Sequence, residues 1–374
     1  MTDVHTTDLA ALARDAGWRR EVSETILGGQ RLSRDQGEAL YATDDLAWLG
    51  GLARERQRAL SGEAVLFNVN RHLNLTNVCA ASCSYCSFER KPGAEDAYTM
   101  RFAEAVAKAK EMEGEGLTEL HVVNGLHPVL PYEYYPTSIR KLKEALPDVA
   151  IKAFTATEID WFTKLTGKDA EWVLDDLVAA GLASLTGGGA EIFDPEIRDQ
   201  IVDHDCHWER WSEIHALAHA KGLKTPCTML YGHIEAPRHR VDHVLRLREL
   251  QDSTGGFVTF IPLRFHPENS RLSHLPLATG AEAMKVFAVS RLLFDNVPHL
   301  KCFWVMHGLD LAQLLLEFGV DDLDGSVVEY KITHDPTGRT PDTMHREDLL
   351  KLIRDAGRTP VERDTRYNVV RTYD

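Results

Sequence analysis

The chain contains the stretch Cys79-Ala80-Ala81-Ser82-Cys83-Ser84-Tyr85-Cys86, which places three cysteines in the spacing C-x3-C-x2-C. Three thiolates this close together can each bind one iron of a cubane [4Fe–4S] cluster, because soft sulfur ligands suit iron. The fourth iron then has no protein ligand, and a small molecule can chelate it through an amine and a carboxylate. The stretch therefore predicts a catalytic iron–sulfur cluster with Cys79, Cys83 and Cys86 as its ligands.

Two other interpretations of these cysteines predict a different kind of protein. A structural zinc site takes four ligands, usually as two separated pairs, whereas the remaining cysteines, at positions 206, 227 and 302, are single and distant. A non-enzymatic electron carrier would use the same three cysteines for its cluster, but it usually adds a fourth and needs no large barrel. Metal analysis separates both alternatives from an enzyme.

Composition and charge narrow the class of protein. The chain has 374 residues, 44% of them hydrophobic and 26% charged, which is typical of a globular fold with one large barrel or two domains. Its formal net charge of -15 argues against nucleic acid or an anionic membrane surface as a partner. Residues 1–20 show no signal pattern, and no apolar run approaches the roughly 20 residues of a membrane helix. Unpaired cysteines and a reducible cluster predict a cytoplasmic location.

Segments with strand character alternate with segments of helical periodicity along most of the chain. The expected strands are 65–77, 118–124, 149–156, 182–187, 225–231, 256–263, 299–305 and 326–332. The expected helices between and after them are 101–115, 135–146, 168–180, 208–221, 239–253, 280–295, 308–318 and 345–356. Residues 6–62 are also expected to be helical, and Ser33 is a plausible helix start.

Eight strands that alternate with helices predict an α/β fold with a parallel sheet, closed as a (β/α)8 TIM-type barrel. We expect residues 1–62 to form an N-terminal helical extension and residues 63–335 to form the barrel. Residues 336–374 are expected to be a C-terminal helix and a polar tail that pack on the barrel.

The first expected strand has one polar and one apolar face. Its polar side chains are Asn68, Asn70, His72, Asn74 and Thr76, and alternate side chains of a strand share a face. The interior of an ordinary barrel is filled by branched apolar side chains. Because buried polar groups need partners, this row predicts a polar cavity that holds a ligand.

Further polar and glycine-rich segments follow other strands, at the ends where such barrels carry their chemistry. The second expected strand ends at Asn124-Gly125. The fourth runs into Gly187-Gly188-Gly189-Ala190-Glu191, where three glycines allow the main chain to approach a ligand closely. These segments predict a binding site beside the cysteine stretch.

The cysteine spacing, with its place after a first strand, resembles the radical S-adenosylmethionine (SAM) superfamily. This resemblance implies a radical SAM barrel and a [4Fe–4S] cluster whose open iron binds the methionyl end of SAM. An electron from the cluster then cleaves SAM to methionine and a 5′-deoxyadenosyl radical. The resemblance also implies an electron donor such as flavodoxin or ferredoxin.

The same resemblance implies contacts with SAM. Asn124 and Gly125 stand where superfamily members often have a Gly-Gly-Glu-like segment, so only its main-chain contact with the SAM amino group carries over. Glu191, after Gly188, would hydrogen-bond a ribose hydroxyl or the SAM ammonium. The remaining implied contacts are Tyr85 and Tyr231 with the adenine and Arg210 with the SAM carboxylate.

Longer segments narrow the resemblance to enzymes of the futalosine route to menaquinone and of deazaflavin biosynthesis. The chain is most similar to the aminofutalosine synthase family, and the alternatives are cyclic dehypoxanthine futalosine synthase or a deazaflavin-pathway enzyme. The segments that carry this resemblance are 70–79, 123–128, 154–159, 187–193, 228–235, 255–267 and 356–365, within residues 45–367.

The narrower resemblance implies a reaction. The deoxyadenosyl radical adds to the vinyl group of 3-[(1-carboxyvinyl)oxy]benzoate, the aryl group migrates, and a carboxylate is lost to give 6-amino-6-deoxyfutalosine. Two carboxylates on this small-molecule substrate require cationic or donor groups, for which Arg264 and His266 are the first candidates and His72 is another. His233 ranks second, for proton transfer or ribose binding.

Overall fold

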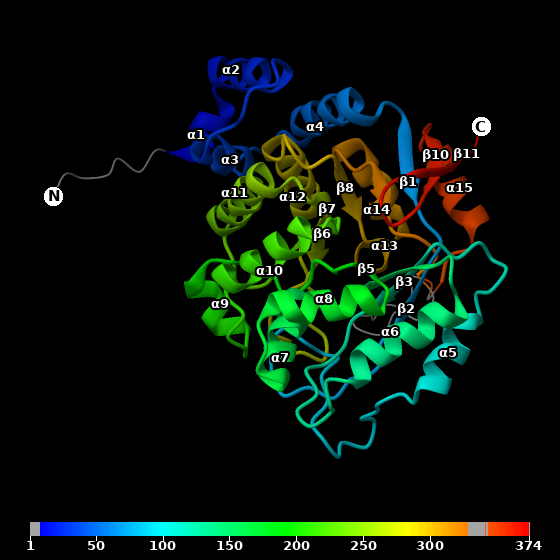
Figure 1. Cartoon of the computed structure of the whole chain (residues 1–374). Helices are drawn as coiled ribbons and strands as arrows, with labels where there is room; N and C mark the ends of the chain where they lie inside the picture. The colour runs from blue at the N-terminus through cyan, green and yellow to red at the C-terminus, as the bar shows by residue number, and fades with distance from the viewer. Residues whose placement is uncertain (1–7, 328–340, 342, 374) are drawn as a thin grey trace.

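The computed structural model describes residues 8–327, 341 and 343–373 (Figure 1). Four helices open the chain: α1 (Leu9–Arg14), α2 (Ala16–Leu27), α3 (Arg34–Tyr41) and α4 (Leu46–Ser61). Ser33 caps α3 as predicted: its hydroxyl accepts from the main-chain N–H of Gln36 (3.2 Å), and the Gln36 side chain accepts from the N–H of Ser33 (2.9 Å). The described part of residues 6–62 is thus helical, as expected.

The strands form two sheets that are parallel apart from the last pair. Strands β2 to β5 form a four-stranded sheet in chain order. The other sheet has the order β11-β10-β1-β9-β8-β7-β6, and only β10 and β11 are antiparallel. The strand bounds are β1 (Ala64–Phe67), β2 (Asn70–Leu73), β3 (Glu119–Val122), β4 (Ala150–Ala153), β5 (Leu182–Ser184), β6 (Thr225–Tyr231), β7 (Phe257–Arg264), β8 (His299–Cys302), β9 (Asp322–Leu323), β10 (Thr359–Arg363) and β11 (Val369–Thr372).

From β2 to β10, helices separate successive parallel strands, and they cover the sheets on the outside (Figure 1). The predicted α/β fold with a parallel sheet is therefore confirmed. The helices after the first four are α5 (Phe102–Lys110), α6 (Tyr134–Ala145), α7 (Ala156–Thr166), α8 (Ala170–Ala180), α9 (Pro195–Ile201), α10 (Trp208–Ala220), α11 (Pro237–Thr254), α12 (Gly280–Leu293), α13 (Trp304–His307), α14 (Leu309–Leu315) and α15 (Arg346–Asp355), with a 3-10 turn η1 (Leu316–Phe318). The sequence did not predict α7, α9 or α13, and α13 begins within the strand that was expected at 299–305.

Among the residues that the structure describes, the strands of the expected barrel pair in two sheets. The predicted first strand divides at Asn68–Val69, so that β1 joins the larger sheet and β2 joins the smaller one. Gly325, in the segment after β9, lies so close to this division that a Cβ on it would be 1.7 Å from the Asn68 carbonyl oxygen. The main chain of that segment therefore occupies the space between β1 and β2.

Side chains link the two sheets at both seams. Between β9 and β2, the Ser326 hydroxyl donates to the carbonyl of Asn70 (2.8 Å) and accepts from its N–H (3.2 Å). Between β5 and β6, the hydroxyl of Thr228 donates to the carbonyl of Gly187 (2.7 Å). These bonds hold the sheets together around a common interior.

The end of the chain differs from its prediction. The predicted last barrel strand, 326–332, lies largely outside the described residues, and the strand observed next to β8 is β9. The predicted polar tail instead forms β10 and β11 beside β1 (Figure 1). β1 would otherwise expose its second edge, and β10 satisfies those main-chain groups. The division into three domains at residues 62 and 335 stays a prediction.

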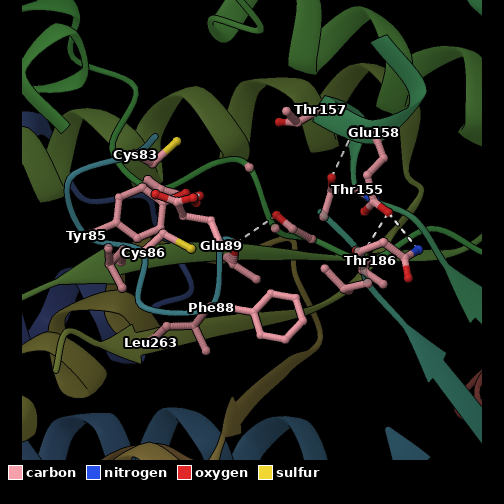
Figure 2. Close-up of a pocket in the computed structure, with 18 of the residues that line it drawn as sticks. Cys83, Tyr85, Cys86, Phe88, Glu89, Thr155, Thr157, Glu158, Thr186 and Leu263 are labelled. Atoms are coloured by element: carbon pink, nitrogen blue, oxygen red, sulfur yellow. Dashed lines mark hydrogen bonds between the residues drawn. The ribbon is translucent and has the colours of Figure 1, made fainter. Parts of the chain in front are cut away.

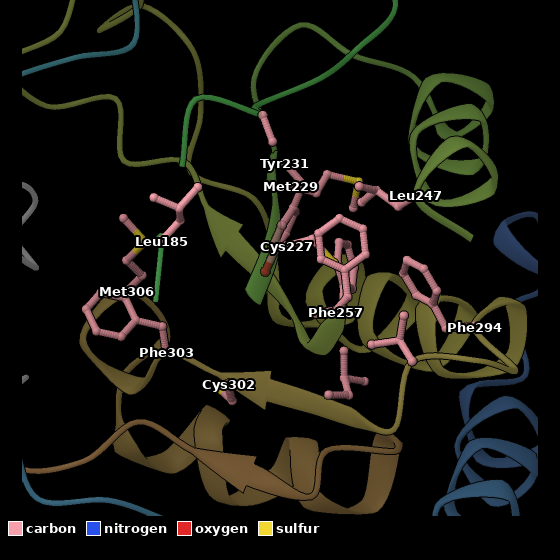
Figure 3. Packing of buried hydrophobic residues seen from close by; sticks show 14 of the residues in the cluster. Leu185, Cys227, Met229, Tyr231, Leu247, Phe257, Phe294, Cys302, Phe303 and Met306 are labelled. Atoms are coloured by element: carbon pink, nitrogen blue, oxygen red, sulfur yellow. The ribbon is translucent and has the colours of Figure 1, made fainter. Parts of the chain in front are cut away.

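The hydrophobic core lies between the sheets and the helices outside them. Figure 3 shows part of it around β6, β7 and β8, where Met229, Phe257 and Phe294 pack together. Cys227 and Cys302 are fully buried in this core, away from the cysteine stretch. In the part of the chain that the structure describes, no helix is both long and apolar enough to cross a membrane.

Candidate active site

A cavity of about 270 Å³ opens at the C-terminal ends of the strands and extends between the two sheets. Figure 2 shows Cys83, Tyr85 and Cys86 on one side of it, with Thr155 and Glu158 on the other. Eleven of the predicted site residues line this cavity: His72, Cys79, Cys83, Tyr85, Cys86, Asn124, Gly125, Gly188, Glu191, Arg264 and His266. The fold thus brings together segments that are far apart in the sequence.

The three cysteines come from one loop after β2, and main-chain N–H groups point at two of the sulfurs. Leu126 donates to Cys79 Sγ (3.3 Å), and Asp203 donates to Cys83 Sγ (3.4 Å). Burial raises the pKa of all three thiols, that of Cys83 to about 12. A metal that binds thiolates would offset this cost, because it replaces the proton as the positive partner of sulfur.

Side chains outside the cavity hold the cysteine loop in shape. The ammonium of Lys91 donates to three successive carbonyl groups, those of Cys79 (3.2 Å), Ala80 (3.1 Å) and Ala81 (2.9 Å). On the other side, the Arg271 guanidinium donates to the carbonyl of Ser82 (2.8 Å). Sequence reasoning missed Lys91, because nothing in its own segment marks it as a partner of the loop.

The glycine-rich segment after β5 lies against the cysteine loop. Tyr85 donates a hydrogen bond to the Glu191 carboxylate, which joins the two segments across the cavity wall. Gly189 has φ of +81°, and a Cβ there would lie 2.3 Å from the hydroxyl of Thr157. A side chain at this position would therefore displace the N-terminus of α7, which also faces the cavity.

Asn124 and Glu158 fix the main chain where β3 ends. The Asn124 side chain accepts from the N–H of Leu75 (2.6 Å) and donates to the Glu158 carboxylate (3.1 Å). Glu158 also accepts from the N–H groups of Asn124 (3.1 Å) and Thr155 (2.8 Å). Burial raises the pKa of Glu158 to about 7 despite these bonds. Sequence reasoning missed Glu158, although Thr155 and Glu158 have the T-x-x-E spacing of a capping box.

Arg264 and His266 lie on the wall that the larger sheet contributes, at the end of β7. The Arg264 guanidinium donates to the carbonyl of Ala278 and still reaches the cavity. The imidazole Nε2 of His266 lies 2.8 Å from the carbonyl oxygen of Met306. These contacts place a cation and an imidazole side by side on a largely apolar wall.

Three predicted site residues lie outside the cavity lining. The Arg210 guanidinium pairs with Asp160 (2.7 Å) and Glu213 (2.8 Å) on the helices outside the barrel. Tyr231 and His233 are absent from the cavity lining and bond to other groups, the Tyr231 hydroxyl with His307 Nε2 (3.0 Å) and His233 Nε2 with the carbonyl oxygen of Leu230 (3.2 Å). Their predicted contacts with SAM or substrate therefore have no geometric support here.

The polar face of the first expected strand is only partly in the cavity. His72 lines it, whereas the Asn70 amide donates to Asp324 (3.0 Å) and the Asn74 amide donates to the carbonyl of Val123 (2.6 Å). Asn70 and Asn74 thus bond to neighbouring segments, whereas Asn68 is fully buried and its side-chain amide has no hydrogen-bond partner among the residues that the structure describes. His121, which the sequence did not suggest, stands beside His72 with its ring stacked at 4.5 Å.

The comparisons with known proteins agree with this geometry. The radical SAM superfamily model matches residues 73–247, and the model of the CofH/MqnC C-terminal region matches residues 254–373. The chain is 65% identical over 371 residues to the aminodeoxyfutalosine synthase of Streptomyces coelicolor, which covers 96% of each chain. This chain belongs to the aminodeoxyfutalosine synthase family of the radical SAM superfamily.

Other relatives place the chain within that family. The aminodeoxyfutalosine synthase of Thermus thermophilus is 42% identical over 357 residues, 94% of this chain and 96% of the relative. The cyclic dehypoxanthine futalosine synthase of Halalkalibacterium halodurans is 30% identical over 354 residues, 94% of this chain and 95% of the relative. The resemblance predicted from the sequence is therefore confirmed at the level of the family, in favour of the first of the two futalosine enzymes.

Solved structures support the fold alone. The FeFe-hydrogenase maturase HydG from Carboxydothermus hydrogenoformans has a TM-score of 0.72 and 18% identity, over 96% of this chain and 83% of that one. Methylornithine synthase (PylB) has a TM-score of 0.71 and 15% identity, over 91% of this chain and 97% of that one. Both comparisons extend over nearly the whole α/β fold.

Membership of the radical SAM superfamily implies a [4Fe–4S] cluster and SAM, and the cysteine loop fits the cluster. Three thiol groups line one wall of the cavity, two of them with N–H donors aimed at sulfur. Among residues 8–327, 341 and 343–373, no three His, Cys, Asp or Glu side chains converge on a single metal ion. The thiolates of a cubane cluster bind different irons, so they need a wider spacing than the ligands of one ion.

Proposed function

We propose that this protein joins the adenosyl group of SAM to 3-[(1-carboxyvinyl)oxy]benzoate and forms 6-amino-6-deoxyfutalosine for menaquinone biosynthesis. The 65% identity to an aminodeoxyfutalosine synthase over 96% of the chain carries this proposal. The cavity supports it, because the predicted cluster ligands and the Arg264–His266 pair open into the same enclosed space. A flavodoxin or ferredoxin as electron donor and a cytoplasmic location belong to the same proposal.

The chain's own residues have positioning roles in this reaction. When bound, the cluster supplies the electron that cleaves SAM and releases the 5′-deoxyadenosyl radical. Cys79, Cys83 and Cys86 would hold the cluster, and the main chain at Gly188 and the carboxylate of Glu191 would contact SAM. The largely apolar cavity excludes water and stray hydrogen donors while the radical adds to the vinyl CH2.

The substrate enters as a dianion, and Arg264 is the cation that faces the cavity from β7. Its guanidinium keeps one hydrogen bond to the carbonyl of Ala278, which fixes its direction and leaves other N–H groups for a carboxylate. His266 stands two residues further on and would bind the same carboxylate. We assign this pair to the enolpyruvyl carboxylate, next to the carbon that reacts.

The proposed function is tested by anaerobic reconstitution with iron and sulfide, followed by incubation with SAM, dithionite and the enolpyruvyl benzoate. We expect a nucleoside with the mass of 6-amino-6-deoxyfutalosine, and none when any one reagent is omitted. SAM cleavage without this product, or turnover of dehypoxanthine futalosine in its place, would contradict the proposal.

A further inference from the structure

Three basic side chains stand in register on β2, β3 and β4, and the two histidines among them line the inner part of the cavity. His72 on β2 is the parallel partner of His121 on β3, and His121 is the partner of Lys152 on β4. Side chains at paired positions of neighbouring parallel strands lie on the same face, next to each other. The two imidazole rings stack with 22° between their planes, and both line the cavity.

A charge-balanced network surrounds this row. Lys152 pairs with Glu119 (2.5 Å), and each of these side chains is at least 90% buried. On the opposite side, Lys301 lies 3.5 Å from Asp324, whose carboxylate also accepts from the amide of Asn70 (3.0 Å). The cations and anions of these pairs largely compensate each other, and the Glu119 carboxylate also lies 3.9 Å from Nδ1 of His121.

Charged groups on neighbouring strands and on the segment after β9 face the two histidines. His72 faces His121, Asp324, Lys152 and Glu119, and His121 faces the same two carboxylates and the same lysine. Burial lowers the pKa of both imidazoles and the positive charge of Lys152 lowers it further, while the carboxylates of Asp324 and Glu119 offset only part of this effect. Both histidines are therefore neutral at pH 7 in the free protein and can accept a proton when an anion arrives.

The surroundings of the histidines fit an aromatic acid. Phe303 lies 6.0 Å from the His72 ring, and Met306 and Ile261 also line the cavity near it. Apolar side chains of this kind pack against an arene, while imidazole N–H groups bind a carboxylate.

We propose that His72 and His121 form an anion subsite that binds the ring carboxylate of an arene-carboxylate substrate and takes up one proton with it. This inference rests on the proposed function and specifies how the substrate lies. The vinyl carbon must reach the radical beside the cysteine loop, which follows β2. The histidines lie within β2 and β3, deeper in the cavity, so the far end of the substrate reaches them.

Binding of the substrate at this subsite takes up one proton. The ring carboxylate stays ionised, one imidazole becomes an imidazolium, and the proton comes from the buffer. Because the bound anion raises the pKa of the imidazole above that in the free protein, binding is tighter at low pH. The dissociation constant then rises about tenfold per pH unit while the pH lies between the free and bound pKa values. A ligand without the ring carboxylate shows no such rise.

The test measures binding without turnover, by calorimetry on the reconstituted enzyme with SAM present and no reductant. The probes are the enolpyruvyl benzoate and its analogue with hydrogen in place of the ring carboxylate. Titrations in two buffers with different ionisation enthalpies give the number of protons taken up. We expect about one proton per substrate molecule and none for the analogue.

Substitutions of the two histidines test whether His72 and His121 are the residues that bind the ring carboxylate. In His121→Gln and His72→Gln, we expect the preference for the substrate over the analogue to fall by about 10- to 100-fold, because a charge-assisted hydrogen bond is lost. The analogue's affinity in the same variant reports whether the cavity remains folded. His345→Gln, at an exposed helix end, is the matched control and should keep the wild-type preference.

Two results would overturn the subsite: no proton uptake by the wild-type enzyme, or an unchanged preference in both histidine variants. If the wild-type enzyme still forms the nucleoside product in either case, the proposed function stands while the subsite falls. Proton uptake and a reduced preference without any nucleoside product would support the subsite and count against the proposed function.

Discussion

The cysteine loop at one end of the cavity and the histidine pair at the other are held by different kinds of contact. Lys91 and Arg271 hold the loop by hydrogen bonds to main-chain carbonyl groups, so its shape depends on a few side chains near the surface. His72 and His121 sit on parallel strands above buried ion pairs, so their position depends on the sheet itself. We therefore expect changes to the buried ion pairs of the inner end to cost more folding stability than changes to the side chains that hold the outer end.

The largest effect is expected at the cysteine loop. Alanine in place of Cys79, Cys83 or Cys86 removes a thiolate ligand, so cluster assembly and SAM cleavage should both be lost. Iron and sulfide analysis with absorption spectra after reconstitution measures this directly. Alanine at Cys206, which is buried outside the cavity lining, is the control and should leave the iron content near that of the wild type. Loss of the cluster in the control with retention in Cys83→Ala would refute the ligand assignment.

Substitutions at the inner end of the cavity should lower the free energy of unfolding of the protein. Lys152→Met leaves the buried Glu119 carboxylate without its cation, which costs about 3–5 kcal/mol in the free energy of unfolding. Urea denaturation under anaerobic conditions measures this loss. Adding Glu119→Gln should restore most of it, because the uncompensated charge is then removed. A double variant as unstable as Lys152→Met alone would show that the pair does not act as a unit.

Glu158 lines the cavity beside Asn124 at the end of β3, and it should make stability depend on pH. Its folded-state pKa of about 7 is above the usual 4.5, so the folded protein holds more protons than the unfolded chain between these values. Stability should therefore fall as the pH rises from 5 to 8, by up to about 3 kcal/mol. Glu158→Gln has no such proton, and its stability curve should be flatter in this range. If the stability of the wild type and that of Glu158→Gln fall in parallel as the pH rises, Glu158 is not the source of the pH dependence.

The smallest effect is expected at Lys91, whose side chain is half exposed. Lys91→Met removes three hydrogen bonds to the cysteine loop, yet water can replace part of each, so we expect the free energy of unfolding to change by less than about 1 kcal/mol. Cluster content after reconstitution should fall measurably, because the loop is less ordered before the metal binds. Lys141→Met, at another exposed position, is the control. Equal cluster content in the two variants would show that the loop needs no clamp.

The contrast between the cysteine loop and the histidine pair also explains which site residues could be predicted from the sequence. The cysteine ligands lie within one short segment, so their spacing alone predicted their role. His121 and Lys152 stand singly in two separate strands, and only the parallel register makes them neighbours of His72. The strand β10 was missed for a related reason, since its partner β1 lies near the other end of the sequence.

The direction in which a side chain points was the other property that could not be predicted from the sequence. Arg210 was predicted to reach SAM, but acidic residues on its own and a neighbouring helix bind it outside the cavity. Tyr231 was expected beside the adenine, and it points into the core toward His307 instead. Sequence position placed both near the correct strand, and it could not determine which face of that strand or helix they occupy.

The most direct test of the central claim is to follow the adenosyl group with SAM labelled in its ribose. During turnover of the enolpyruvyl benzoate, we predict that the label appears in an aryl-ketone nucleoside, in proportion to the SAM consumed. Free 5′-deoxyadenosine should be at most a side product. Stoichiometric release of labelled 5′-deoxyadenosine, with no label in a larger nucleoside, would contradict radical addition and with it the proposed function.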